Sequence, residues 1–118
     1  MEVKRIKIIH KDFEVFAELT DENPKTVELL LEKLPLEGSA KLWKEEVYFE
    51  IPLEYVPENP SSTTKKGDIA YWPPGKAFCI FFGESQPYSE VNILGTIREG
   101  VEKLSSVREG DTIRIEKL

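Results

Sequence analysis

Apolar and polar residues alternate along most of the chain, at the two-residue spacing of half-buried β-strands. This pattern predicts eight strands, at residues 3–9, 13–19, 38–44, 46–51, 69–72, 77–82, 92–97 and 112–117. The range 77–82 is a continuous apolar run, which is typical of a strand that is buried on both faces. It follows Pro73-Pro74-Gly75, which must be a turn because proline lacks the amide hydrogen that a strand ladder needs. We therefore expect the core to be built around the hairpin 67–83.

One segment has helical spacing instead. Its apolar residues recur at i, i+3, i+4 and i+7 and form one stripe: Val27, Leu30, Leu31 and Leu34. Asn23 is a good N-cap, and Pro24 suits the first helical position. Since Pro35 ends the pattern, we expect a helix from Pro24 to Leu34 that lies across a barrel end or a sheet face. A shorter helix is predicted within 100–107.

The order of these elements predicts a mainly β domain of about eight strands and two helices. Many short antiparallel strands favour a closed barrel, because closure removes the exposed sheet edges. No repeat or change of composition divides the chain, so residues 1–118 are expected to form a single domain. The proline-containing segment 52–66 is predicted to be a long surface loop, and loops of this length often carry function.

The composition of the chain argues against several classes of function. The formal net charge is −6, and without a basic patch we expect no nucleic-acid partner. The chain has one cysteine and one histidine, so we expect no disulfide and no metal site. No dinucleotide or phosphate-binding fingerprint is present, so no cofactor is expected. Because no signal peptide or membrane-spanning run is visible, we predict a cytoplasmic protein with no membrane partner.

Several motifs are similar to those of cyclophilins. The segment 23–28 (NPKTVE) resembles the Pro-Lys-Thr-Ala-Glu start of the first cyclophilin helix, and the segments 95–104 and 112–115 resemble the end of the domain. Two further segments are hallmarks of a compact prokaryotic group of cyclophilin-like proteins of uncharacterised function: Trp43 to Phe49 and Gly67 to Gly75. The resemblance covers nearly the whole chain and implies a cyclophilin-like closed β-barrel.

The same resemblance implies a function that the residues do not fully support. Cyclophilins isomerise X-Pro bonds with an arginine on the third strand, but this chain has its arginines elsewhere: Arg5, Arg98, Arg108 and Arg114. The nearest cations are Lys41 and Lys44, and lysine lacks the bidentate fork of arginine. The chain is therefore predicted to be a non-catalytic binding module for a small molecule or a short peptide. The alternatives are a divergent peptidyl-prolyl isomerase without the usual arginine and an oligomeric structural protein.

Aromatic residues near the central hairpin mark the candidate ligand-binding site. We expect a pocket formed by Trp43, Glu46, Tyr48, Tyr71, Trp72 and Phe81. The alternative for the two tryptophans is that they fill the barrel ends. A carboxylate against aromatic rings has a raised pKa, which makes Glu46 beside Tyr48 the candidate acid. The commoner location of a glutamate is the solvated surface, and on that ground we expect Glu46 there.

The other polar residues have structural explanations. Cys79 lies in the most apolar strand and is predicted to be inert packing. His10 is next to a turn and is expected to be exposed. Asp68 and Asp111 each follow a glycine before a strand, which indicates that each carboxylate bonds the backbone of its own turn.

Overall fold

A computed structural model describes residues 4–54 and 57–118, and this part of the chain forms nine strands, one α-helix and two 3₁₀ helices. The first strands and the helix are β1 (Arg5–His10), β2 (Phe13–Leu19) and α1 (Pro24–Lys33). The central elements are β3 (Leu36–Ser39), β4 (Lys41–Trp43), β5 (Glu46–Glu50), β6 (Asp68–Trp72), η1 (Pro73–Gly75) and β7 (Ala77–Phe81). The last elements are β8 (Asn92–Ile97), η2 (Val101–Ser106) and β9 (Thr112–Lys117).

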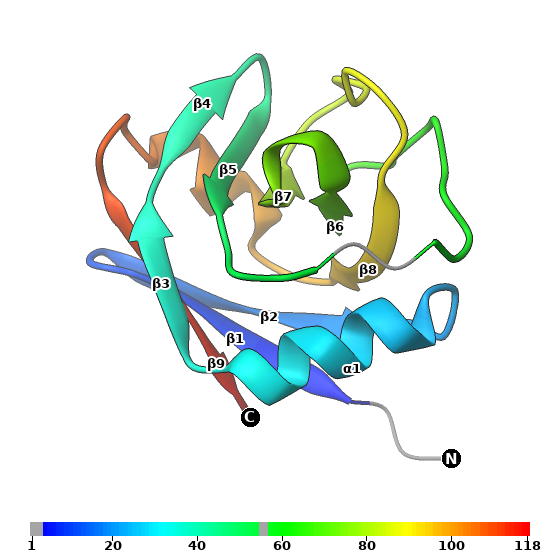
Figure 1. The fold of residues 1–118 in the computed structure, drawn as a ribbon. Helices are drawn as coiled ribbons and strands as arrows, with labels where there is room; N and C mark the ends of the chain where they lie inside the picture. Colours follow the sequence, from blue (N-terminus) through cyan, green and yellow to red (C-terminus); the bar gives the residue numbers. More distant parts are fainter. Residues whose placement is uncertain (1–3, 55–56) are drawn as a thin grey trace.

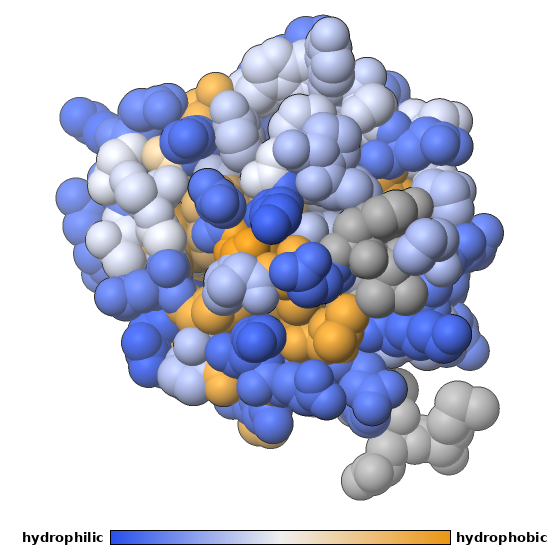
Figure 2. Space-filling view, in the orientation of Figure 1, coloured by the Kyte–Doolittle hydropathy of each residue, from blue (hydrophilic) through white to orange (hydrophobic). Residues whose placement is uncertain are grey.

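The strands form one antiparallel sheet that curls into a nearly closed barrel (Figure 1). Their order is β3-β9-β1-β2-β8-β6-β7-β5-β4. α1 lies across one end of the barrel, where it packs against β8. The face of the molecule seen in Figure 2 is mostly hydrophilic, and the hydrophobic residues on it gather near its middle. The prediction of a mainly β barrel with helices is confirmed.

The predicted strand 38–44 is two strands, and this accounts for the ninth. β3 pairs with β9, whereas β4 pairs with β5. Ala40 is the residue between them: its amide N–H donates to the carbonyl oxygen of Asp111 at 2.7 Å, and its carbonyl accepts from Gly110 N at 2.8 Å. The chain therefore changes partner at Ala40, and the two edge strands of the sheet are consecutive in the sequence.

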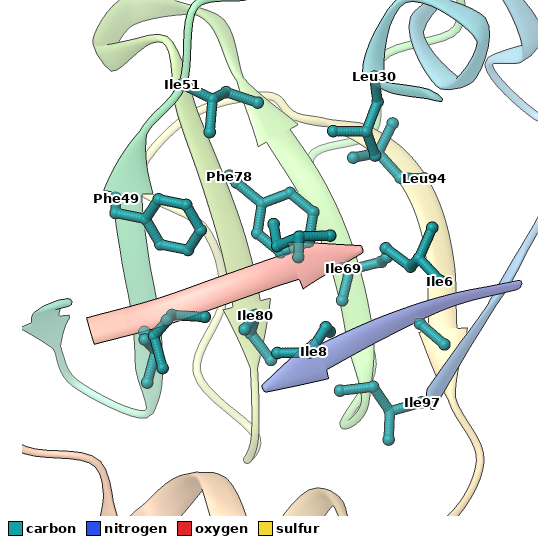
Figure 3. Close-up of a cluster of buried hydrophobic side chains, with 14 of the residues drawn as sticks. Ile6, Ile8, Leu30, Phe49, Ile51, Ile69, Phe78, Ile80, Leu94 and Ile97 are labelled. Carbon is teal, nitrogen blue, oxygen red and sulfur yellow. The ribbon is translucent and has the colours of Figure 1, made fainter. Parts of the chain in front are cut away.

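The barrel interior is filled by aliphatic and aromatic side chains from facing strands (Figure 3). β7 is buried on both faces, as its apolar run predicted. Phe78 and Ile80 point into the barrel, where they join Ile6, Ile8 and Ile69. The alternate residues of β7 belong to a second, smaller cluster: Ala70, Ala77, Cys79, Phe81, Val91 and Ile93. Because successive strand residues face opposite sides, this second cluster lies on the outer face of the barrel.

α1 begins at Pro24, as predicted, but its capping group comes from elsewhere in the chain. Asn23 occupies the N-cap position without capping; its side chain donates to Ile93 O at 3.0 Å and accepts from Asn59 N at 2.8 Å. The carboxylate of Glu58 instead accepts from the backbone N–H groups of Lys25 at 2.9 Å and Thr26 at 2.8 Å. It thereby satisfies helix donors that would otherwise lack partners.

Replacing Glu58 with alanine is expected to lower the free energy of unfolding by about 1 kcal/mol, the usual cost of losing a helix cap. Desolvation opposes ionisation, but the N–H and hydroxyl donors of Lys25 and Thr26 hold the pKa of Glu58 below its usual value. A lowered pKa means that the contribution is present above the unfolded pKa and is lost as the pH falls. Urea unfolding at pH 7 and at pH 3 measures both effects. Glu58→Gln is the matched control, since it retains an acceptor oxygen and should lose less; equal stability of wild type and alanine variant at pH 7 would contradict the capping role.

His10 is buried, so the expectation of an exposed side chain was wrong. Its exposed fraction is only 4%, its Nε2 lies 2.7 Å from the Asp111 carboxylate, and its ring stacks on Phe13. The hydrogen bond with His10, and one from the backbone of Arg108, hold the pKa of Asp111 below its usual value. The barrel brings the 110–111 turn against the 11–12 turn. The contact between His10 and Asp111 joins residues 101 positions apart, so no local sequence pattern could have predicted the burial of His10.

Both aspartates that follow a glycine accept a hydrogen bond from the backbone of their own turn. Asp68 accepts from Lys65 N at 2.8 Å and Asp111 from Arg108 N at 3.0 Å, so both turn roles are confirmed. In the segment 52–66, predicted as a surface loop, Leu53 and Thr64 are buried; residues 55–56 lie outside the described residues, as does Val3 of the first predicted strand. Within the described ranges, no helix has the length and hydropathy needed to cross a membrane.

Candidate functional site

A pocket of about 250 Å³ lies on the outer face of the barrel, over strands β4 to β7. Its second side is the segment 83–91, which rises beside the β4–β5 hairpin (Figure 1). In Figure 2 the surface over these segments is largely pale, neither strongly hydrophilic nor strongly hydrophobic. The lining residues are Trp43, Glu46, Tyr48, Trp72, Phe81, Pro87, Tyr88 and Val91.

Strand register determines the floor of this pocket. Glu46 of β5 lies opposite Phe81 of β7, and Tyr48 lies opposite Cys79. Since side chains alternate along a strand, Glu46 and Tyr48 both point outward, onto the second cluster. Trp43 pairs with Glu46 across the β4–β5 hairpin, which brings its indole to the same face.

Two tryptophans and one tyrosine form the walls. The Tyr88 ring lies 6.3 Å from the Trp43 ring at an interplanar angle of 85°, and 6.3 Å from the Trp72 ring at 89°. Trp72 is held in place because its Nε1 donates to Ser89 Oγ at 2.7 Å. Gly75 packs directly under the same indole, where an added Cβ would lie 2.7 Å from the ring. The three rings therefore converge on one space from different segments.

The segment 83–91 is fastened to the barrel at several points. Glu45, in the β4–β5 turn, accepts from Glu84 N at 3.0 Å, and its own N–H donates to Ser85 Oγ at 3.0 Å. Gln86 Oε1 accepts from Thr64 N at 2.9 Å. At the far end, Val91 forms a β-bridge with Ser61. These bonds position Pro87 and Tyr88 over the outer face of the strands.

Glu46 is buried, with 7% of its surface exposed, and the expectation of a solvated location was wrong. Burial raises the pKa of its carboxyl above the usual value, although a hydrogen bond with the Cys79 thiol opposes the shift. The Cys79 thiol is itself buried, and burial together with the nearby Glu46 charge raises the pKa of the thiol well above its usual value. A thiol held neutral in this way is inert. In residues 4–54 and 57–118, no lysine or arginine forms an ion pair with Glu46.

Of the six residues predicted for the site, five line this pocket, and Tyr71 does not. Tyr71 is the neighbour of Trp72 on β6 and faces the opposite side, into the barrel interior. Its hydroxyl donates to Leu53 O at 2.6 Å. Pro87, Tyr88 and Val91 were missed because they lie at or beyond the end of an irregular stretch with no periodic pattern. The one available signal was a proline–tyrosine pair inside a polar segment.

Comparison with known families now assigns the chain to a class. Residues 4–116 match the model of the family described as Cyclophilin-like, so the protein belongs to the cyclophilin-like family. The solution structure of the hypothetical protein AF2241 from Archaeoglobus fulgidus is similar, with a TM-score of 0.85 and 34% identity. That match covers 98% of this chain and 95% of AF2241.

A more distant likeness concerns the fold alone. The structure of McbB in complex with tryptophan matches with a TM-score of 0.79 and 16% identity, over 94% of this chain and 44% of the McbB chain. This chain therefore spans less than half of McbB. A search of curated proteins found no match.

Proposed function

We propose that this protein is a non-catalytic binding module whose outer-face pocket takes a small molecule or a short peptide segment. The observation that carries the proposal is a concave site with mostly aromatic walls and one buried carboxylate at its floor. Such a combination of apolar surface and few polar groups is typical of ligand pockets. The volume of about 250 Å³ suits a small ligand or a single side chain.

The cations of the chain support a binding role over isomerisation. Among the described residues, no arginine or lysine lines the pocket. Arg98 and Arg114 form ion pairs with Glu18 and Glu116, on the β1–β2–β9 side of the barrel. An isomerase of the cyclophilin kind needs a donor fork facing an apolar proline slot, and the aromatic and acidic lining offers none.

Titration of ¹⁵N-labelled protein with a panel of probes tests this proposal. Tryptophan is a natural first probe, because the fold relative McbB was solved with it; X-Pro peptides form the second arm. We expect saturable chemical-shift changes at the indole N–H signals of Trp43 and Trp72. In the same samples, cis/trans exchange of the peptides should keep its uncatalysed time of tens of seconds or longer.

Two results would count against the binding role. The absence of shifts with every probe in the panel would remove the pocket from consideration as a binding site. Accelerated X-Pro exchange at substoichiometric protein, abolished by Trp72→Ala, would instead assign an isomerase activity to it. The Phe16→Ala variant is the control, since Phe16 is an exposed aromatic on a different face of the barrel.

A further inference from the structure

We propose that the outer-face pocket binds an organic ammonium group, held between aromatic rings and a carboxylate. The groups that would surround it are Trp43, Trp72, Tyr88 and Glu46. This inference rests on the proposed binding function and adds to it the charge and chemical class of the ligand.

The aromatic rings are arranged as a cation site requires. A cation is attracted to the negative face of an aromatic ring, most strongly to tryptophan. Here two indoles and a phenol from three segments line one space, and the Tyr88 ring stands nearly perpendicular to both indoles. Rings that stack on one another would leave no room for a guest, whereas perpendicular rings leave a corner that a compact group can occupy.

The carboxylate supplies the second observation. Glu46 is buried and lines the same pocket as these rings, and no basic side chain of the described residues forms an ion pair with it. Burial of an unpaired carboxylate costs folding free energy, and apolar residues in its place would avoid this cost. A cationic ligand in the pocket would provide the missing partner of this carboxylate.

The protein already places one ammonium group over one of these rings, on a lysine that does not itself line the pocket. Lys44 Nζ lies 4.7 Å from the centroid of the Trp43 ring. The indole therefore accepts a cation in the native fold, on a side chain that lines the pocket. The net charge of −6 also favours the approach of cations over anions.

Alkylated ammonium groups suit the site better than a bare ammonium. Quaternary ammonium ions are the usual guests of aromatic cages, and a pocket of about 250 Å³ has room for such a head group. The same group occurs in free small molecules, such as choline, and in methylated lysine side chains of peptides. The pocket would recognise the ammonium group of either source in the same way, so an experiment must distinguish a free small molecule from a methylated peptide.

Isothermal titration calorimetry with choline and its uncharged isostere 3,3-dimethyl-1-butanol measures the contribution of the positive charge. We expect choline to bind about 10-fold more tightly or better than the alcohol, since a desolvated cation–π contact and a charge pair together exceed 1.4 kcal/mol. Trimethyl-lysine, free and within a short peptide, forms the second arm. Stronger binding of the peptide than of choline would support a peptide source, and the reverse would support a free small molecule.

Two substitutions test the groups that would hold the ammonium. Glu46→Gln removes the negative charge, and Tyr88→Ala removes one of the aromatic rings. Glu46→Gln should weaken choline binding about 10-fold, which corresponds to about 1.4 kcal/mol, because the ammonium loses its charged partner; binding of the alcohol should be unchanged. Glu50→Gln is the matched control, because Glu50 lies on the same strand but is exposed and outside the pocket. Tyr88 is 80% exposed, so Tyr88→Ala keeps the fold and should still weaken choline binding several-fold.

The possible failures are distinguishable. Equal affinity for choline and the alcohol, or binding of tryptophan or X-Pro peptides without any binding of ammonium probes, would overturn the ammonium proposal and leave the binding function in place. Failure of every probe would overturn both. Unchanged choline affinity in Glu46→Gln and Tyr88→Ala would place choline elsewhere on the protein and overturn the assignment to this pocket.

Discussion

Replacing Gly95 with alanine is expected to lower the melting temperature by roughly 10 °C or more, because overpacking a core costs about 1–3 kcal/mol and occasionally more. Gly95 lies in β8, directly opposite Leu19 of β2. An added Cβ would collide with the carbonyl oxygen of Glu18 and lie 2.9 Å from the Cα of Leu19. These are backbone atoms, so no rotation of a side chain can relieve the clash.

The position of this clash in the sheet makes it costly. β2 and β8 join the β3-β9-β1 part of the sheet to the β6-β7-β5-β4 part, through three paired positions. Separation of these two strands would open the barrel along its length. Glu14→Ala is the control, because Glu14 lies on β2 as well but its side chain is exposed.

Thermal unfolding followed by circular dichroism compares the two variants. The control should change stability by about 0.5 kcal/mol or less, as surface substitutions usually do. A Gly95→Ala variant that melts at the same temperature as the wild type would show that the β2–β8 pairing can widen without loss, and it would contradict the close approach of the two backbones at Gly95.

Glu46→Gln is expected to make the protein more stable at pH 7, although it removes a charged group from the candidate site. Burial raises the pKa of this carboxyl in the folded state, so folding opposes its ionisation. A raised folded pKa in an acid means that stability falls as the pH rises through the interval between the unfolded and folded pKa values. At pH 7 the wild type therefore carries a cost that the uncharged glutamine does not.

The pH dependence identifies the cause. The stability advantage of Glu46→Gln should be present at pH 7 and shrink as the pH falls through the usual glutamate pKa, because below it the wild-type carboxyl is protonated in both states. Urea unfolding of both proteins at several pH values measures this difference, with Glu50→Gln as the variant of an exposed glutamate on the same strand. A Glu46→Gln variant that is less stable at pH 7 would mean that the carboxylate is well compensated in the free protein.

Local sequence patterns predicted those features of the strands and of the candidate pocket that depend on residues close in the sequence. The two-residue alternation places Glu46 and Tyr48 on one face, whatever the rest of the chain does. The same rule places Tyr71 and Trp72 on opposite faces of β6. The hypothesis that both line one pocket is therefore inconsistent with this alternation, and only Trp72 lines the pocket. The helix start at Pro24 was predictable because a missing amide hydrogen costs nothing at that position.

The parts that could not be predicted depend on contacts between distant segments. Glu46 lines its pocket together with residues of the distant segment 83–91, and His10 is buried where its ring meets Asp111 in the turn before β9. The break at Ala40 has no local signature either, since it arises where the chain leaves β9 and joins β5. Similarly, the cap of α1 comes from Glu58, more than thirty residues away from the amides that it accepts.

The placement of Trp43 and Trp72 has a practical consequence for spectroscopy. The chain has two tryptophans, and both line the same pocket. The intrinsic indole emission of the protein therefore originates entirely at the candidate site, with no background from tryptophans elsewhere. A guest that enters between the rings displaces water from both indoles, so quenching or a change of emission wavelength would report occupancy directly on the unlabelled, unmodified protein.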